Sequence, residues 1–270
     1  MHCFRLLLPF VAVLLAFGPA QAASRSPRVL SLNLCADQLL LALADPGQIV
    51  ALSRFSRDAG MSAAARKARN FPVASGGIEA VLRDRPDLVL AGPYDRPVTS
   101  GVLARQGIAV RIVPLWQGFA AGAAEIRALA AALGHPERGV ALVAHIEAAR
   151  EAAANAGAGR SALALGRGGY VDGADSLTGS LLAAVGLRPA IPAAHGRFVP
   201  LETLLQLDPQ VLVLAEGRSA ANDRGAALLR HPALRAWAAG RRVVTLPPAL
   251  TACPGPGLVE ALDILAAGLR

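Results

Sequence analysis

The sequence has 270 residues, of which 54% are hydrophobic and only 4% aromatic, and its formal net charge at pH 7 is +8. This composition is typical of a packed α/β or helical protein and excludes a disordered chain. The positive charge comes almost entirely from arginines spread along the chain, with Lys67 as the only lysine. Because no basic run or RNA-type aromatic motif accompanies them, the sequence disfavours nucleic acid as a partner. An arginine-bearing surface that meets an anionic ligand is the simpler interpretation.

Residues 1–23 have the pattern of a secretory signal peptide. Arg5 precedes the apolar run Leu6–Phe17, and the small residues around Ala20–Ala22 form a cleavage site. That run is shorter than the roughly 20 apolar residues of a membrane-spanning helix, and no later segment supplies them. Cys3 lies ahead of the run, so no lipid-attachment cysteine stands at the cleavage point. We therefore expect the mature chain in the periplasm, neither spanning the membrane nor anchored to it.

Short aliphatic runs alternate with helix-forming stretches in residues 24–117, which is typical of βα units around a parallel sheet. The expected strands are Arg28–Asn33, Ile49–Ser53, Leu88–Ala91 and Ala109–Leu115. The expected helices are Ala36–Ala44, Ile78–Arg85 and Val98–Gln106. These elements predict an N-terminal α/β lobe.

The alternation stops in residues 118–158, which are almost continuously helix-forming apart from Gly134–Pro136 and predict a linking helical spine. It resumes in residues 159–270, which predict a C-terminal α/β lobe. The expected strands there are Ser161–Leu165, Val211–Ala215 and Arg242–Leu246. The expected helices are Leu177–Val185, Leu201–Leu207, Gly225–Ala239 and Leu258–Leu269.

An internal repeat relates the two lobes. Ile78–Leu90 aligns without a gap with Leu201–Val213, and in each copy a glutamate opens a helix, a proline ends it and an aliphatic strand follows. The sequence therefore predicts an α/β fold of two Rossmann-like lobes with parallel-sheet cores, joined by a long helix. The cleft between such lobes is the expected ligand site.

This organisation resembles the iron-siderophore and vitamin B12 periplasmic binding proteins of ABC importers. The likeness rests on the two lobes, the spine, the repeated Glu-x6-Pro pattern and three segments in the family's order, Val29–Asn33, Ile49–Ser53 and Leu177–Gly186. It implies a monomeric substrate-binding protein that captures a ferric siderophore or related metal chelate. The implied partner is an ABC permease dimer with its ATPase. Around Ser75–Gly77 the chain lacks a tryptophan of the B12-binding member, which disfavours cobalamin itself.

The resemblance assigns permease docking to Glu79 and Glu202, one surface glutamate in each lobe. The alternative is that each glutamate, in the first turn of its helix, only complements the helix dipole, which contributes roughly 0.3–1 kcal/mol. The same residue recurs at the same register in both lobes. That recurrence favours docking.

Candidate ligand contacts are residues on loops at the strand ends, where clefts of α/β proteins form. Aromatic side chains there can pack on a macrocycle or chelate, and arginines can pair with its carboxylates or phosphate. A packed or solvated loop position is the alternative for each of them. The candidates are Asn33, Cys35, Asp37, Phe55, Arg57, Tyr94, Arg96, Trp116, Tyr170, Arg197, Phe198 and Cys253.

Cys35 and Cys253 are the two cysteines of the mature chain, and the resemblance places both near the cleft. An oxidising compartment favours a disulfide between them, which would join the lobes across the cleft. Alternatively, both thiols face the ligand, where Cys35 at a helix N-terminus could coordinate a metal centre. They can also be two unrelated buried cysteines. The sequence leaves these three possibilities open.

No catalytic, metal or cofactor motif stands out. The chain has no Gly-x-Ser-x-Gly elbow, and Gly166–Gly169 has neither the lysine of a phosphate loop nor the spacing of a dinucleotide site. Only His195 among the histidines falls in a plausible cleft loop. The sequence thus predicts a binding protein for import, not an enzyme, with no cofactor and no resident metal. Cobalamin or haem as cargo, an exported enzyme on the same two-lobe fold, and a metal or haem chaperone without its own permease are the alternatives.

Overall fold

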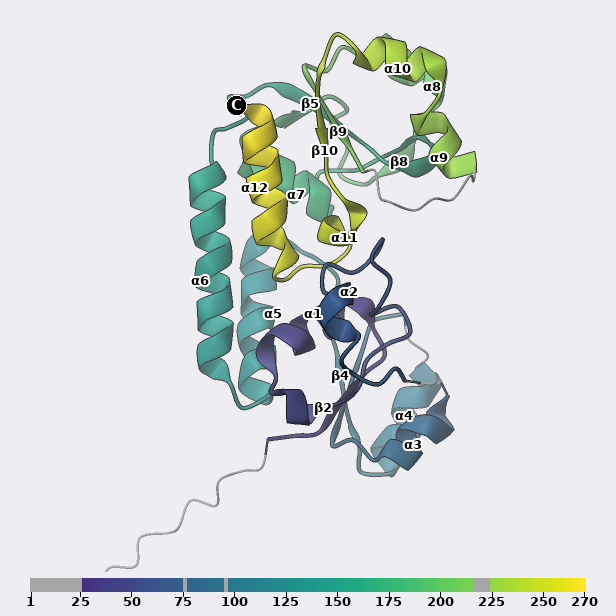
Figure 1. Ribbon diagram of the computed structural model, residues 1–270, viewed down its shortest axis with the longest axis vertical. Helices are drawn as coiled ribbons and strands as arrows, with labels where there is room; N and C mark the ends of the chain where they lie inside the picture. Colours follow the sequence, from purple (N-terminus) through teal and green to yellow (C-terminus); the bar gives the residue numbers. More distant parts are fainter. Residues whose placement is uncertain (1–25, 75–76, 95–96, 216–223) are drawn as a thin grey trace, which may run out of the picture.

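A computed structural model describes residues 26–74, 77–94, 97–215 and 224–270. Two α/β lobes are stacked along the long axis of the molecule, and helices run along one side of both (Figure 1). The predicted signal peptide lies outside the described residues. Among the helices that are described, none combines the length and the apolar character needed to cross a membrane.

The N-terminal lobe contains a four-stranded parallel sheet in the order β2-β1-β3-β4. Its strands are β1 (Val29–Ser31), β2 (Ile49–Ala51), β3 (Leu88–Ala91) and β4 (Ala109–Ile112). Its helices are α1 (Leu34–Leu43), α2 (Ala65–Ala68), α3 (Ile78–Asp84) and α4 (Pro97–Arg105), and η1 (Pro46–Gln48) is a 3-10 turn. Strands β1 and β3 are the central ones, and their aliphatic side chains are almost entirely buried, as continuous apolar runs in parallel sheets require.

The C-terminal lobe contains a mixed sheet in the order β10-β9-β5-β6-β8, with β7 also paired to β5. Strands β5 (Ser161–Leu165), β9 (Val211–Leu214) and β10 (Arg242–Thr245) form its parallel core, joined by β7 (Arg188–Pro189). Strands β6 (Tyr170–Val171) and β8 (Arg197–Phe198) are antiparallel to their neighbours. These two-residue strands are too short to show a pattern in the sequence.

The helices of this lobe are α7 (Leu177–Ala184), α8 (Leu201–Gln206), α9 (Arg224–Leu229), α10 (Pro232–Ala238), α11 (Pro248–Thr251) and α12 (Gly257–Leu269), with the 3-10 turn η2 (Arg167–Gly169). The single helix expected over Gly225–Ala239 is wrong, because the structure divides it into α9 and α10. Pro232 cannot donate a backbone hydrogen bond and begins a new helix, and His231 caps that helix by accepting from the Ala233 N–H.

The spine consists of two helices, α5 (Phe119–Ala132) and α6 (Pro136–Ala153), that pack side by side and turn at Gly134–Pro136 (Figure 1). Their close approach needs a glycine, since a Cβ at Gly139 would lie 2.6 Å from the Ala130 Cβ. One hydrophobic core runs through both lobes and the spine, and includes Leu40, Leu129 and Leu262. The spine therefore belongs to the packed interior and is not a flexible linker.

Candidate functional site

A disulfide joins the two lobes at their junction. Cys35 follows β1 and Cys253 follows β10, and these two residues form a disulfide with a Cα–Cα distance of 5.0 Å. This bond holds the first turn of α1 in the N-terminal lobe against the segment after α11 in the C-terminal lobe. We call the segments that carry the predicted ligand residues of each lobe the wall of that lobe. In open α/β proteins, ligands bind at the carboxyl ends of the strands.

The disulfide decides between the three possibilities that the sequence leaves open for the cysteines. It is an inter-lobe disulfide, so neither residue offers a free thiol to a ligand or a metal. Cys253 is almost completely buried, at 2% exposure. Cys35 lies in the first turn of α1, where its backbone N–H donates to the Asn33 side chain over 2.9 Å.

Asn33 and Asp37, two of the predicted ligand residues, hold the start of α1 and the loop after β2 in place. Asn33 is the N-cap of α1, and its Oδ1 also accepts from the Ala36 N–H. Asp37 is fully buried, and its carboxylate accepts from the Ser53 N–H at 2.9 Å and the Ser53 hydroxyl at 2.5 Å. Burial raises the pKa of Asp37 to about 6, although the hydrogen bonds from Ser53 and Ser31 lower it.

The wall from the N-terminal lobe carries aromatic and cationic side chains. Phe55 is 38% exposed, and the Arg54 guanidinium carbon lies 4.6 Å from the centre of its ring. Arg57 is exposed and donates to the Phe71 carbonyl over 2.6 Å. Tyr94 follows β3 and is 83% exposed. Arg96 lies outside the described residues.

The wall from the C-terminal lobe has the same chemistry. The Tyr170 and Phe198 rings pack edge to face with centroids 5.3 Å apart, because β6 and β8 pair directly at these two residues. Phe198 remains 72% exposed, and its neighbour Arg197 is exposed. The Tyr170 hydroxyl lies against Gly196, where a Cβ would be only 2.2 Å away, so glycine is required there.

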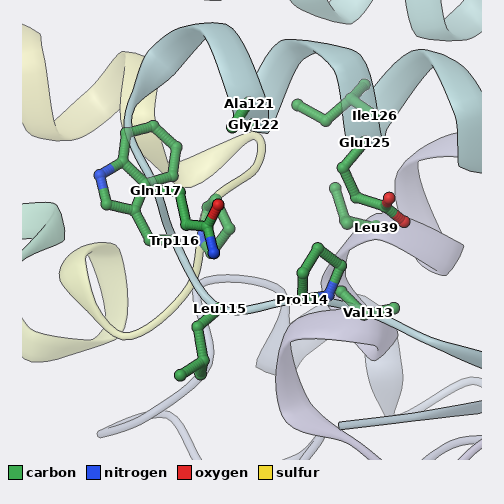
Figure 2. A pocket seen from close by; sticks show the side chains of 11 residues that line it. Leu39, Val113, Pro114, Leu115, Trp116, Gln117, Ala121, Gly122, Glu125 and Ile126 are labelled. Carbon is green, nitrogen blue, oxygen red and sulfur yellow. The ribbon is translucent and has the colours of Figure 1, made fainter. Parts of the chain in front are cut away.

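Trp116 lies at the lobe junction and is half-buried. Its indole N–H donates to the Ser180 hydroxyl in α7 over 2.9 Å, and its ring meets Phe119 edge to face at 5.2 Å. The same ring lines a small apolar pocket that is open to solvent, between α1, α5 and the segment after β4 (Figure 2). Leu39 and Pro254 also line this pocket, which therefore contains side chains of both lobes. Trp116 thus connects the lobes in addition to any contact with a ligand.

The predicted docking glutamates are both exposed in the first turn of their helices. Glu79 is the second residue of α3, and Glu202 is the second residue of α8. The two helices lie at one edge of the molecule, in different lobes, and α6 lies at the opposite edge (Figure 1). Their positions leave both glutamates accessible to a partner that spans the two lobes.

Within the described part of the chain, no three His, Cys, Asp or Glu residues gather closely enough to hold a metal ion. His195 lies 3.6 Å from Asp175, and both side chains are largely exposed. Asp172 is more buried than Asp175. Burial raises the pKa of Asp172, although hydrogen bonds from the Thr178 and Ser176 side chains lower it.

Three residues with a direct part in this arrangement were not among the predicted ones. Arg54 stacks over Phe55, Ser53 connects Asp37 to the exposed loop, and Ser180 accepts from Trp116. The position of Arg54 directly before Phe55 was a usable signal in the sequence. The other two depend on long-range contacts that no local pattern indicates.

The chain matches known proteins over most of its length. A family model described as periplasmic binding protein matches residues 29–250. No curated protein matches the sequence. A periplasmic heme-binding protein from Pseudomonas aeruginosa has 23% identity and a TM-score of 0.73, covering 90% of this chain and 92% of its own. The periplasmic vitamin B12 binding protein of Vibrio cholerae has 18% identity and a TM-score of 0.69, covering 90% and 97%. A protein of an ABC-type Fe3+-hydroxamate transport system from Saccharomonospora viridis has 22% identity and a TM-score of 0.67, covering 90% and 93%.

Proposed function

Because the chain belongs to the periplasmic binding protein family of ABC importers, we propose that it captures an anionic metal chelate of the ferric siderophore class in the periplasm. It then delivers this ligand to an ABC permease dimer with its ATPase. The observation that carries the choice of ligand is the chemistry of the two walls, each of which presents exposed aromatic rings beside exposed arginines. This role requires no catalytic group.

The wall chemistry fits a large ligand with flat, polarisable surfaces and negative charge at its edge. Phe55, Tyr94 and Phe198 offer ring faces without demanding a fixed hydrogen-bond pattern. Arg57 and Arg197 can pair with carboxylates or hydroxamate oxygens at the periphery of the chelate. Neutral sugars and amino acids would leave these rings and charges without partners.

Binding to a panel of probes tests this proposal. Purified mature protein is titrated calorimetrically with a ferric hydroxamate, hemin, cyanocobalamin, glucose and an amino acid. We expect the ferric hydroxamate to bind most tightly, and Phe198→Ala to weaken it about 10-fold, the effect of losing one packed ring. Val243→Ala is the matched control and should leave the affinity unchanged, because Val243 is an exposed apolar side chain on β10, at the opposite edge of the same sheet from β8. Tighter binding of glucose or the amino acid would refute the proposal. Tighter binding of hemin or cyanocobalamin would show that this ligand, and not a ferric siderophore, is the cargo.

Delivery depends on Glu79 and Glu202 in this proposal. Exposed charges at a rim govern partner choice and association, so reversing both to Arg should abolish permease-dependent uptake and leave ligand affinity nearly unchanged. Glu151→Arg is the control, because Glu151 is an exposed glutamate of α6 at the opposite edge of the molecule. Uptake that survives the double reversal would show that these glutamates only complement their helix dipoles.

An exported enzyme on the same fold is the competing class of function. Incubation of the purified protein with each probe that binds, followed by mass spectrometry of the probe, separates the two classes. We expect every probe to be recovered unchanged. A chemically altered probe would favour the enzyme.

A further inference from the structure

A single surface loop carries much of the positive charge of the chain. We call residues 53–72, which follow β2 and contain α2, the basic loop. Its cations are Arg54, Arg57, Arg66, Lys67 and Arg69. Asp58 is its only acidic residue. The formal charge of the loop is therefore +4, against +8 for all 270 residues.

Hydrogen bonds close the basic loop at its neck and hold it against the lobe. The Leu52 N–H donates to the Pro72 carbonyl over 2.9 Å, and the Ala74 N–H donates to the Leu52 carbonyl over 2.8 Å. The Lys67 ammonium donates to the Leu41 carbonyl of α1 over 2.5 Å. The loop is thus a folded unit that presents its other side chains from fixed positions.

Neighbouring carboxylates do not neutralise the positive charge of the basic loop. Within the described part of the chain, none of its five cations forms an ion pair. Arg66 and Arg69 are exposed, and no described residue accepts a hydrogen bond from either side chain. Asp58 accepts from the Gly60 N–H inside its own turn. An uncompensated cluster of cations attracts a surface of negative charge.

Exposed apolar side chains accompany these cations. Met61 is 42% exposed and Phe55 is 38% exposed on the same loop. Basic side chains beside apolar ones are typical of surfaces that bind the interface of an anionic bilayer, where phosphates lie next to acyl chains. A bilayer offers many phosphates without fixed spacing, so arginines spread over a loop can all find partners. A folded acidic protein would instead need carboxylates at matching positions, and these would leave Met61 without an apolar partner.

We propose that the basic loop binds reversibly to anionic phospholipid at the membrane surface. Arg66 and Arg69 pair with lipid phosphates, and Met61 enters the boundary between headgroups and acyl chains. Phe55 and Arg57, at the start of the loop, remain available to the ligand. In Figure 1, α2 lies along the long axis between α3 and α8, the helices that carry the predicted docking glutamates. Lipid binding at α2 would keep the protein close to its permease, and this consequence alone rests on the proposed function.

Sedimentation with sucrose-loaded vesicles tests this proposal. The mature protein is mixed with vesicles of phosphatidylcholine alone or of phosphatidylcholine with phosphatidylglycerol. Binding is measured at low salt and at about 1 M sodium chloride, where the Debye length is about 3 Å. Arg66→Gln with Arg69→Gln removes two charges from the loop. Arg127→Gln with Arg235→Gln is the matched control, because it removes two charges from exposed arginines of α5 and α10. Thermal unfolding shows that each variant is folded, and polyglutamate added at the same anionic charge as the lipid tests for an acidic protein partner.

We expect the wild-type protein to bind the anionic vesicles at low salt, to leave the neutral vesicles unbound, and to be released at high salt. The loop variant should bind about 10- to 30-fold more weakly, since each basic residue near an anionic surface contributes a factor of about 5. The control should bind within about 3-fold of the wild-type protein, because charges far from the contact are screened. Failure of the wild-type protein to bind anionic vesicles, equal binding to both kinds of vesicle, or equal losses in the two variants would overturn the proposal. Release of most of the bound protein by polyglutamate would also overturn it, in favour of an acidic protein. These measurements need neither cargo nor permease, so they decide the proposal even if the proposed function fails.

Discussion

Replacing Asp37 by Asn should change how the stability of the protein depends on pH. The carboxyl group is fully buried, and burial raises its pKa from 3.8 to about 6. A carboxyl whose pKa is higher in the folded state than in the unfolded state stabilises the fold below the unfolded-state value, and this stabilisation is lost as the pH rises through the folded-state value. For Asp37 the full difference is about 3 kcal/mol, of which about 2 kcal/mol falls between pH 4.5 and pH 7.5.

Asn has the same shape and can still accept from the Ser53 N–H, but it does not titrate. The free energy of unfolding of Asp37→Asn, taken relative to the wild-type protein, should therefore rise by about 2 kcal/mol from pH 4.5 to pH 7.5. Urea unfolding followed by circular dichroism at several pH values measures it. Asp263→Asn is the control for the removal of a carboxyl group, since Asp263 is exposed on α12. A pH-independent difference for Asp37→Asn would refute the assignment of a buried, titrating carboxyl.

Two further predictions concern stability. Denatured, unreduced protein should show no reactive thiol from Cys35 or Cys253, and two thiols per mature chain would contradict the disulfide. Replacing both cysteines by serine should lower the free energy of unfolding by about 5 kcal/mol, because the disulfide closes a loop over 218 residues and so reduces the entropy of the unfolded chain. Leu129→Ala should lower the free energy of unfolding by about 2–5 kcal/mol, because Leu129 of the spine is fully buried in the hydrophobic core. A loss below about 1 kcal/mol would indicate that this part of the core is loosely packed.

Much of the fold follows from local patterns in the sequence. The strands expected at Leu88–Ala91 and Ser161–Leu165 are confirmed to the residue, because a central parallel strand must be aliphatic on both faces. The repeated Glu-x6-Pro pattern indicated a helix followed by a strand in each lobe, and α3 with β3 and α8 with β9 confirm this. Proline was a weaker signal for the end of a helix. Pro232 lies inside a stretch that is otherwise helix-forming, so one helix was expected where the structure has two.

The site required the tertiary structure, because each of its decisive contacts joins residues far apart in the chain. Sequence alone indicated which loops follow the strands, and so which residues were candidates. It did not show that Asp37 is buried beneath Ser53, that Tyr170 packs on Phe198, or that Cys35 and Cys253 meet. Burial and pairing are set by how two sheets and a spine pack against one another, and these long-range distances leave no periodic signal along the chain.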